Sequence, residues 1–221
     1  MMTSLREHLR LPQVRGRTRV VTLLVGLVVG GGGIALTLWA GLGLGPYDVL
    51  IHGVSQQLGT TFGIASMLTS SVVVAAGWRL GGPVGPGTIA GMLGIGPAVD
   101  GWTWVLPEAT PALWWTQTAG LLAGLVVLAF GLSLVVASDL GAAPVEVLML
   151  GLSGRGLSLA WVRTLLEVTM AVTGFAIGGM LGVGTVVIAL AIGHLMALFL
   201  PAASRPDVGT GRGSDGPTGS G

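Results

Sequence analysis

Apolar residues in this chain run in long stretches that are separated by short segments rich in glycine, proline and polar residues. A helix needs about 17 to 25 mostly apolar residues to cross the roughly 30 Å hydrocarbon core of a bilayer. The pattern predicts six such helices, at residues 20–42, 62–79, 88–106, 115–138, 159–177 and 185–200. We therefore expect an all-α fold, a polytopic membrane protein with six transmembrane helices.

Two further segments are too short to cross. Residues 46–58 would form only about 20 Å of helix at roughly 1.5 Å per residue, and they contain Asp48, His52 and Gln56. Residues 144–156 occupy the corresponding place later in the chain. We expect both to be short re-entrant or interfacial helices, and the sequence does not decide between these two placements.

The chain repeats itself. "LGLGPYDVLIHGVS" at residues 42–55 returns as "LGAAPVEVLMLGLS" at 140–153, and "GGPVGPGT" at 81–88 returns as "GGMLGVGT" at 178–185. The two pairs keep the same order and nearly the same spacing, which indicates a duplicated unit. With three crossings in each unit, the second must enter the membrane in the opposite direction, an inverted repeat of the kind common in secondary transporters.

This organisation predicts a domain division. We expect a cytoplasmic basic N-terminal arm (1–19), a first three-helix repeat (20–106), an outer loop (107–114), a second three-helix repeat (115–201) and a disordered cytoplasmic tail (202–221).

Composition and charge agree with a membrane protein. Of the 221 residues 52% are hydrophobic and only 9% are charged, against about a quarter charged in ordinary soluble domains. There are no cysteines, which excludes disulfides and thiolate chemistry. All basic residues are arginines, and a cytoplasmic N-terminus places Arg79, Arg155, Arg205 and Arg212 on the cytoplasmic side too. We expect a multi-pass protein of the bacterial inner membrane with both termini cytoplasmic.

The motifs "GLGPYDVL", "GGPVGPGT" followed by "GIGPAVD", "DLGAAPVEVL", and Arg163 and Glu167 followed by "GGMLGVGT" resemble one known group. Over about residues 17–200 the chain is similar to the YczE/YyaS/YitT family of bacterial integral membrane proteins, most closely its YczE-like branch. The resemblance implies a six-helix inner-membrane protein and no established biochemical activity. One departure is that His194 stands where the first repeat has Pro97.

Each repeat places an acid just behind a proline break. Gly45 and Pro46 precede Asp48, and Pro144 precedes Glu146. A proline in the first turn loses no hydrogen bond, and an acid near the third position faces the positive helix end. This helix-start interpretation stands beside a second one, in which both acids line a break in the membrane and bind a proton or cation.

Further charges lie inside the predicted spans. Arg163 and Glu167 are four residues apart and can pair on one helical face, where the first repeat has Ser66 and Ser70. They form either a packing pair or a site for a charged ligand group. Asp100 lies either near the membrane surface or on a translocation path.

The glycine turns Gly87-Thr88 and Gly184-Thr185 invite a phosphate-binding interpretation, but they lack the lysine and serine of a P-loop. We expect the two threonines to cap the following helices. The sequence shows no ATP-binding motif, and we expect no cofactor and no metal site.

These patterns favour a transporter or permease-like protein for a small polar or ionic solute, driven by a gradient rather than by ATP. Asp48, Glu146, Arg163, Glu167 and Asp100 are the candidate residues for binding the solute or an ion. A non-transporting scaffold or accessory protein is the alternative. A remote one is an intramembrane serine protease that uses Ser153 and His194. We expect no enzyme activity, a lipid bilayer as partner and no nucleic acid, and the sequence leaves a homo-oligomer open.

Overall fold

The computed structural model describes residues 16–107 and 112–203, and all regular secondary structure in this part of the chain is helical. The elements are α2 (Gly16–Ala40), α3 (Pro46–Leu58), α4 (Phe62–Arg79), α5 (Pro86–Thr103), α6 (Trp114–Ser138), α7 (Pro144–Ser153), α8 (Leu159–Ala176) and α9 (Val183–Ala203). The predicted all-α class is confirmed. The predictions for the basic arm before residue 16, part of the outer loop and the tail after residue 203 concern residues outside these ranges.

Five of these helices are long and apolar enough to cross a membrane, namely α2, α4, α6, α8 and α9. The sixth predicted crossing, residues 88–106, corresponds to α5. This helix has 18 residues, but Pro97, Asp100 and several glycines interrupt its apolar character. The short helices α3 and α7, with 13 and 10 residues, begin at Pro46 and Pro144 as predicted. The chain is therefore a polytopic membrane protein.

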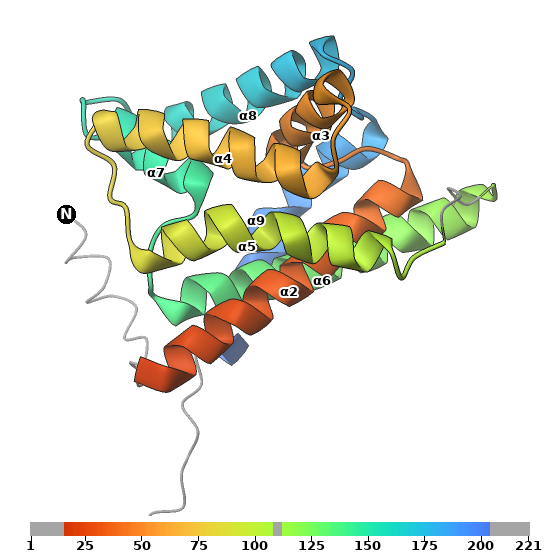
Figure 1. Ribbon diagram of the computed structural model, residues 1–221, viewed down its shortest axis with the longest axis horizontal. Helices are drawn as coiled ribbons and strands as arrows, with labels where there is room; N and C mark the ends of the chain where they lie inside the picture. Colours follow the sequence, from red (N-terminus) through yellow and green to blue (C-terminus); the bar gives the residue numbers. More distant parts are fainter. Residues whose placement is uncertain (1–15, 108–111, 204–221) are drawn as a thin grey trace, which may run out of the picture.

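The helices form two layers (Figure 1). The long helices α2 and α6 cross in close contact and lie in one layer with α5, while α3, α4, α7 and α8 form the other layer. The largest cluster of buried apolar side chains draws on both layers and consists of Ile34, Ala35, Leu44, Val49, Ile51, Phe62, Ala65, Val99 and Leu128. Close packing of these side chains helps to hold the two layers together.

Many helix contacts occur in matched pairs, and the main contact between the two layers is that of α4 with α5. Helix α3 packs on α8 and α7 packs on α4, while α5 packs on α2 and α9 packs on α6. A Cβ atom on Gly174 of α8 would lie 2.5 Å from the backbone nitrogen of Leu50, and one on Gly77 of α4 would lie 2.6 Å from that of Leu148. Both glycines are therefore required, because only a hydrogen leaves room for the short helix.

The starts of α5 and α9 are fixed in the same matched way. Gly87 donates its backbone N–H to the Leu140 carbonyl at 2.9 Å, and Gly184 donates to the Leu42 carbonyl at 2.8 Å. The Thr88 hydroxyl oxygen accepts a hydrogen bond from the backbone N–H of Gly85, as the Thr185 oxygen does from Gly182. Both threonines thus bond to the start of their helices, as expected, but each does so as the third helical residue, and Gly85 is the N-cap of α5.

Candidate functional site

The two halves of the chain differ at one seam between helices. The contact of α4 with α5, which we call the first seam, is closed at the start of α4. Gly63 and Gly96 are buried there, and a Cβ atom on Gly63 would lie 2.7 Å from the Gly96 carbonyl oxygen. Asp100 completes the closure, because its carboxylate accepts hydrogen bonds from the Thr61 hydroxyl at 2.6 Å and from the Gly63 backbone N–H at 2.8 Å.

The corresponding contact between α8 and α9, the second seam, is open. In the described part of the chain these two helices do not pack against each other as α4 and α5 do. Ala160 stands in place of Gly63, and Ala197 stands in place of Asp100. Gly193, in place of Gly96, is exposed, and a Cβ atom there would meet no atom within 4 Å. The second seam therefore lacks the glycine at the position of Gly63 and the carboxylate of Asp100 that close the first.

The open seam carries a charged pair. The Arg163 Nε atom donates to a Glu167 carboxylate oxygen at 2.9 Å, and the two side chains are 55% and 34% exposed. Their counterparts in α4, Ser66 and Ser70, are buried, and the Ser70 hydroxyl is hydrogen-bonded to the Tyr47 hydroxyl of α3 at 2.8 Å. The predicted pairing on one face of α8 is confirmed. The two charged positions of the second half are thus more exposed than the matching serines of the first.

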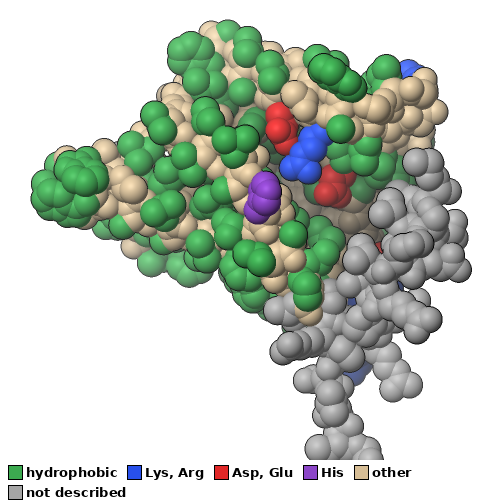
Figure 2. Space-filling view, turned by 180° about the vertical axis from the view of Figure 1, so that it is seen from behind, with side chains coloured by type: hydrophobic (Ala, Val, Ile, Leu, Met, Phe, Trp, Pro, Cys, Tyr) green, Lys and Arg blue, Asp and Glu red, His purple; other side chains and the backbone are tan. Residues whose placement is uncertain are grey.

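The pair with Glu167 uses only the Nε atom of the Arg163 guanidinium. Neither of the two terminal nitrogens of this guanidinium has a hydrogen-bond partner among the described residues. Opposite α8, His194 is exposed on α9, and its Nδ1 lies 3.1 Å from the Leu190 carbonyl oxygen of its own helix. Figure 2 shows this face, with a basic side chain between acidic side chains and a histidine nearby.

The two repeat acids differ in their bonding. A Glu146 carboxylate oxygen accepts a hydrogen bond from the Ala143 backbone N–H at 3.0 Å, which closes the first turn of α7. Asp48 holds the matching position in α3, close to Gly45, but its carboxylate has no hydrogen-bond partner among the described residues. The helix-start interpretation thus accounts for Glu146 more fully than for Asp48, which keeps a free carboxylate.

Asp100 has a different role from the other candidates. It binds the start of α4 through Thr61 and Gly63 and so holds two helices together. Thr61 also caps α4, since its hydroxyl oxygen accepts from the Ile64 backbone N–H at 3.2 Å. Sequence reasoning missed Thr61, although a threonine just before an apolar helix is a recognisable capping signal.

The remaining predicted groups do not assemble into a catalytic site in the described residues. Ser153 is half-buried at the end of α7, its buried hydroxyl oxygen has no partner among the described residues, and no hydrogen bond joins it to His194. No group of three or more potential ligands among histidine and the acids is close enough to hold a metal within the ranges 16–107 and 112–203.

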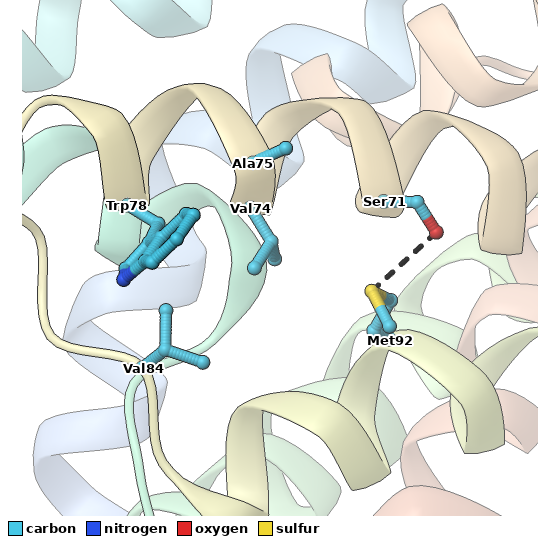
Figure 3. A pocket seen from close by; sticks show the side chains of 6 residues that line it. All are labelled: Ser71, Val74, Ala75, Trp78, Val84 and Met92. Carbon is cyan, nitrogen blue, oxygen red and sulfur yellow. Dashed lines mark hydrogen bonds between the residues drawn. The ribbon is translucent and has the colours of Figure 1, made fainter.

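A separate hollow of about 320 Å³ lies between α4 and α5, at the end away from Asp100 (Figure 3). Its lining consists of Ser71, Val74, Ala75, Trp78, Val84 and Met92. The Ser71 hydroxyl donates to the Met92 sulfur at 3.5 Å, and no charged side chain is present in the lining. The first seam is thus closed at the start of α4, and this hollow lies between its helices near the end of α4.

Comparison with known proteins places the chain among uncharacterised bacterial relatives. A family of unknown function (DUF6198) matches residues 17–201. The chain is 33% identical over 184 residues to an uncharacterised protein of Haemophilus influenzae, covering 83% of this chain and 84% of that protein. It is 28% identical to the uncharacterised membrane protein YczE of Bacillus subtilis, covering 80% and 82% of the two chains.

A third relative, the uncharacterised protein YyaS of Bacillus subtilis, is 28% identical over 190 residues, which are 82% of this chain and 92% of YyaS. No solved structure matches the chain. The resemblance to the YczE and YyaS proteins that the motifs indicated is confirmed.

Proposed function

The chain belongs to the family of unknown function DUF6198, and we propose that it is a permease-like transporter for a small polar or ionic solute. The energy would come from a proton or cation gradient, because the sequence carries no ATP-binding motif. We propose no enzyme activity. This assignment rests on the seams between helices, since a fold alone does not determine a function.

For this transporter we propose a topology of two inverted halves with six membrane crossings. Helices α2, α4 and α5 would cross in the first half, and α6, α8 and α9 in the second. Helix α5 is as long as α4, and its charged residue is satisfied by the start of α4 rather than exposed to lipid. The matched contacts α3 with α8 and α7 with α4 support a two-fold relation between the halves.

The placement of arginine supports an orientation with both termini in the cytoplasm. In that orientation Arg19 at the start of α2, Arg79 at the end of α4 and Arg155 before α8 lie on the cytoplasmic side, as the positive-inside tendency favours. The start of α4 and the end of α5, where Asp100 lies, then face outward. The start of α8 and the end of α9 face the cytoplasm.

The observation that carries the proposal is that one seam is closed and the other open. In transporters with inverted halves, solute access alternates when one half or bundle moves against the other around a fixed site. The closed end of the first seam, at Asp100, would be the outer gate. The open end of the second seam, at Ala160 and Gly193, would be the inner gate. The structure then corresponds to an inward-open state.

The candidate residues fall into separate roles in this scheme. Arg163 and Glu167 line the open gate, with the terminal nitrogens of Arg163 available to an anionic group of the solute. Asp48, whose carboxylate lacks a partner, would bind the coupling proton or cation, with Glu146 as its counterpart in the second half. Asp100 would lock the outer gate rather than bind solute.

Thermal unfolding of the purified protein against a panel of ions, amino acids, peptides and anions tests the proposal. A ligand at about 100 times its dissociation constant stabilises the folded state by roughly 2.7 kcal/mol. We expect a stabilising solute whose effect is lost in Asp48→Asn or Arg163→Gln and is retained in Arg155→Gln, a matched change of an exposed arginine in the turn before α8. That solute should then be taken up by liposomes containing the protein.

A panel without any stabilising solute, together with variants as stable as the parent chain, would contradict transport. That result would instead support a scaffold or accessory protein.

A further inference from the structure

We propose that the open second seam binds the oxyanion of an amphipathic molecule, with the terminal nitrogens of Arg163 on the anionic head and the tail along α9. The inference rests on the proposed function in assuming that this seam admits a ligand, and it adds the chemical class of that ligand.

Arg163 supplies the positive charge of the proposed site. Arg163 uses only Nε for Glu167, so that the outer edge of its guanidinium keeps free donors in the described structure. That edge matches carboxylate and phosphate groups in a two-point geometry. An arginine within a membrane helix costs several kcal/mol unless it reaches water, a headgroup or a partner. Glu167 already provides one partner, and an anionic head on the free edge would provide a second.

The depth of Arg163 fits a headgroup. It is the fifth residue of α8, about 6 Å along the helix axis from the first residue. Trp161 lies just before it and is 77% exposed, and exposed tryptophans of membrane helices gather at the membrane surface. The free edge of Arg163 is therefore at the level where anionic heads of amphiphiles lie.

The amphiphile can enter the second seam laterally, from the lipid phase. Helices α8 and α9 are the least covered of the five candidate spans, with only 17% of each most apolar window buried. Deeper along α9 from His194, Leu190 is 70% exposed and Val186 is 60% exposed. A hydrocarbon tail beside these side chains partitions into the apolar phase and holds the head at the level of Arg163, so that an amphiphile reaches the site at a higher local concentration than a small anion.

Binding is measured by thermal unfolding in neutral maltoside micelles with dodecyl phosphate at increasing mole fraction. Inorganic phosphate supplies the head without the tail, and dodecanol supplies the tail without the charge. We expect dodecyl phosphate to raise the unfolding temperature in a saturable way, with an apparent affinity at least tenfold above that for inorganic phosphate. Dodecanol should give no saturable shift.

Three variants locate the site. Arg163→Gln should weaken dodecyl phosphate binding at least tenfold, Arg163→Lys should weaken it less, and the matched control Arg155→Gln should leave it unchanged. Gly193→Leu keeps the arginine but fills the open seam, and it should also abolish binding. A shift that survives both Arg163→Gln and Gly193→Leu, or one that inorganic phosphate reproduces with equal affinity, would overturn the inference.

A competition experiment identifies the source of the anion. Phosphatidylglycerol that competes with dodecyl phosphate in the parent chain identifies a headgroup of the bilayer, and lack of competition identifies a separate amphiphilic solute. Both results keep the site at Arg163. Because the assay measures binding without flux, an Arg163-dependent shift without alternation of the seams would leave this site standing and remove the transport proposal.

Discussion

The Asp100 carboxylate accepts a hydrogen bond of 2.6 Å from the Thr61 hydroxyl, and this bond fastens the end of α5 to the start of α4. The same carboxylate accepts the Gly63 backbone N–H. No equivalent bond exists between α8 and α9 in the described chain, since Ala197 stands in place of Asp100. The bond thus marks one place where the two halves differ.

Replacing Asp100 by asparagine should lower the stability of the protein. Hydrogen bonds to a charged group contribute about 1.5 to 3 kcal/mol each, so we expect a loss of this order in thermal unfolding. A double-mutant cycle with Thr61→Val checks the cause. If the bond is responsible, the two losses should be clearly less than additive. Additive losses would mean that Asp100 and Thr61 act independently.

The close glycine contacts predict a matched pair of severe effects. Gly77→Ala and Gly174→Ala should each destabilise strongly, because the new methyl group would collide with the backbone of α7 or α3. Gly193→Ala is the control, since open space surrounds it. There the gain in helix propensity, about 0.8 to 1 kcal/mol, should leave stability unchanged or improved. Equal effects of all three changes on the unfolding temperature would contradict the described packing.

The two capping threonines should differ in importance. The Thr88 hydroxyl accepts from Gly85 and also donates to the Ala142 carbonyl at 2.7 Å, while Thr185 has only the first kind of bond in the described structure. Thr88→Val leaves buried polar groups unpaired, at a cost of about 1 to 3 kcal/mol, and it should destabilise more than Thr185→Val. Thr88→Ser should restore most of the loss in chemical or thermal unfolding.

Removal of the two repeat acids, Glu146 and Asp48, should lower the unfolding temperature by different amounts. Glu146 closes the first turn of α7 through Ala143, and removal of such a cap costs about 1 kcal/mol. We expect Glu146→Ala to lower the unfolding temperature more than Asp48→Ala, since Asp48 makes no such bond. The reverse order would assign Asp48 a structural role and weaken its proposed role in coupling.

Much of the fold was predictable from the sequence because lipid requires long apolar helices. The predicted spans match the observed helices to within a few residues, except that α2 begins at Gly16, four residues earlier than predicted. The short helices were predictable from Pro46 and Pro144. The apolar pattern also predicted α5, although this helix is not among the five candidate spans of the structure, because Asp100 and several glycines interrupt its apolar character.

The site was predictable only in part. The spacing of Arg163 and Glu167 predicted their pairing. Comparison of the two repeats showed that Ala197 in the second stands where the first has Asp100. The sequence could not reveal that Asp100 binds Thr61, because that bond joins residues 39 positions apart on two helices. Nor could it reveal an open second seam, which depends on how closely α8 approaches α9.

Transport as proposed requires the two seams to alternate, and cysteine cross-linking measures whether they do. The chain has no cysteine of its own, so the double variant Ala160→Cys with Gly193→Cys reports only on the second seam. We expect oxidation in membranes to form a disulfide in part of the molecules, since this seam closes when the first one opens. Adding Asp100→Asn should raise the yield, because loss of the outer lock shifts the population. No disulfide in either background, with both thiols still labelled by a maleimide, would show that the second seam does not close.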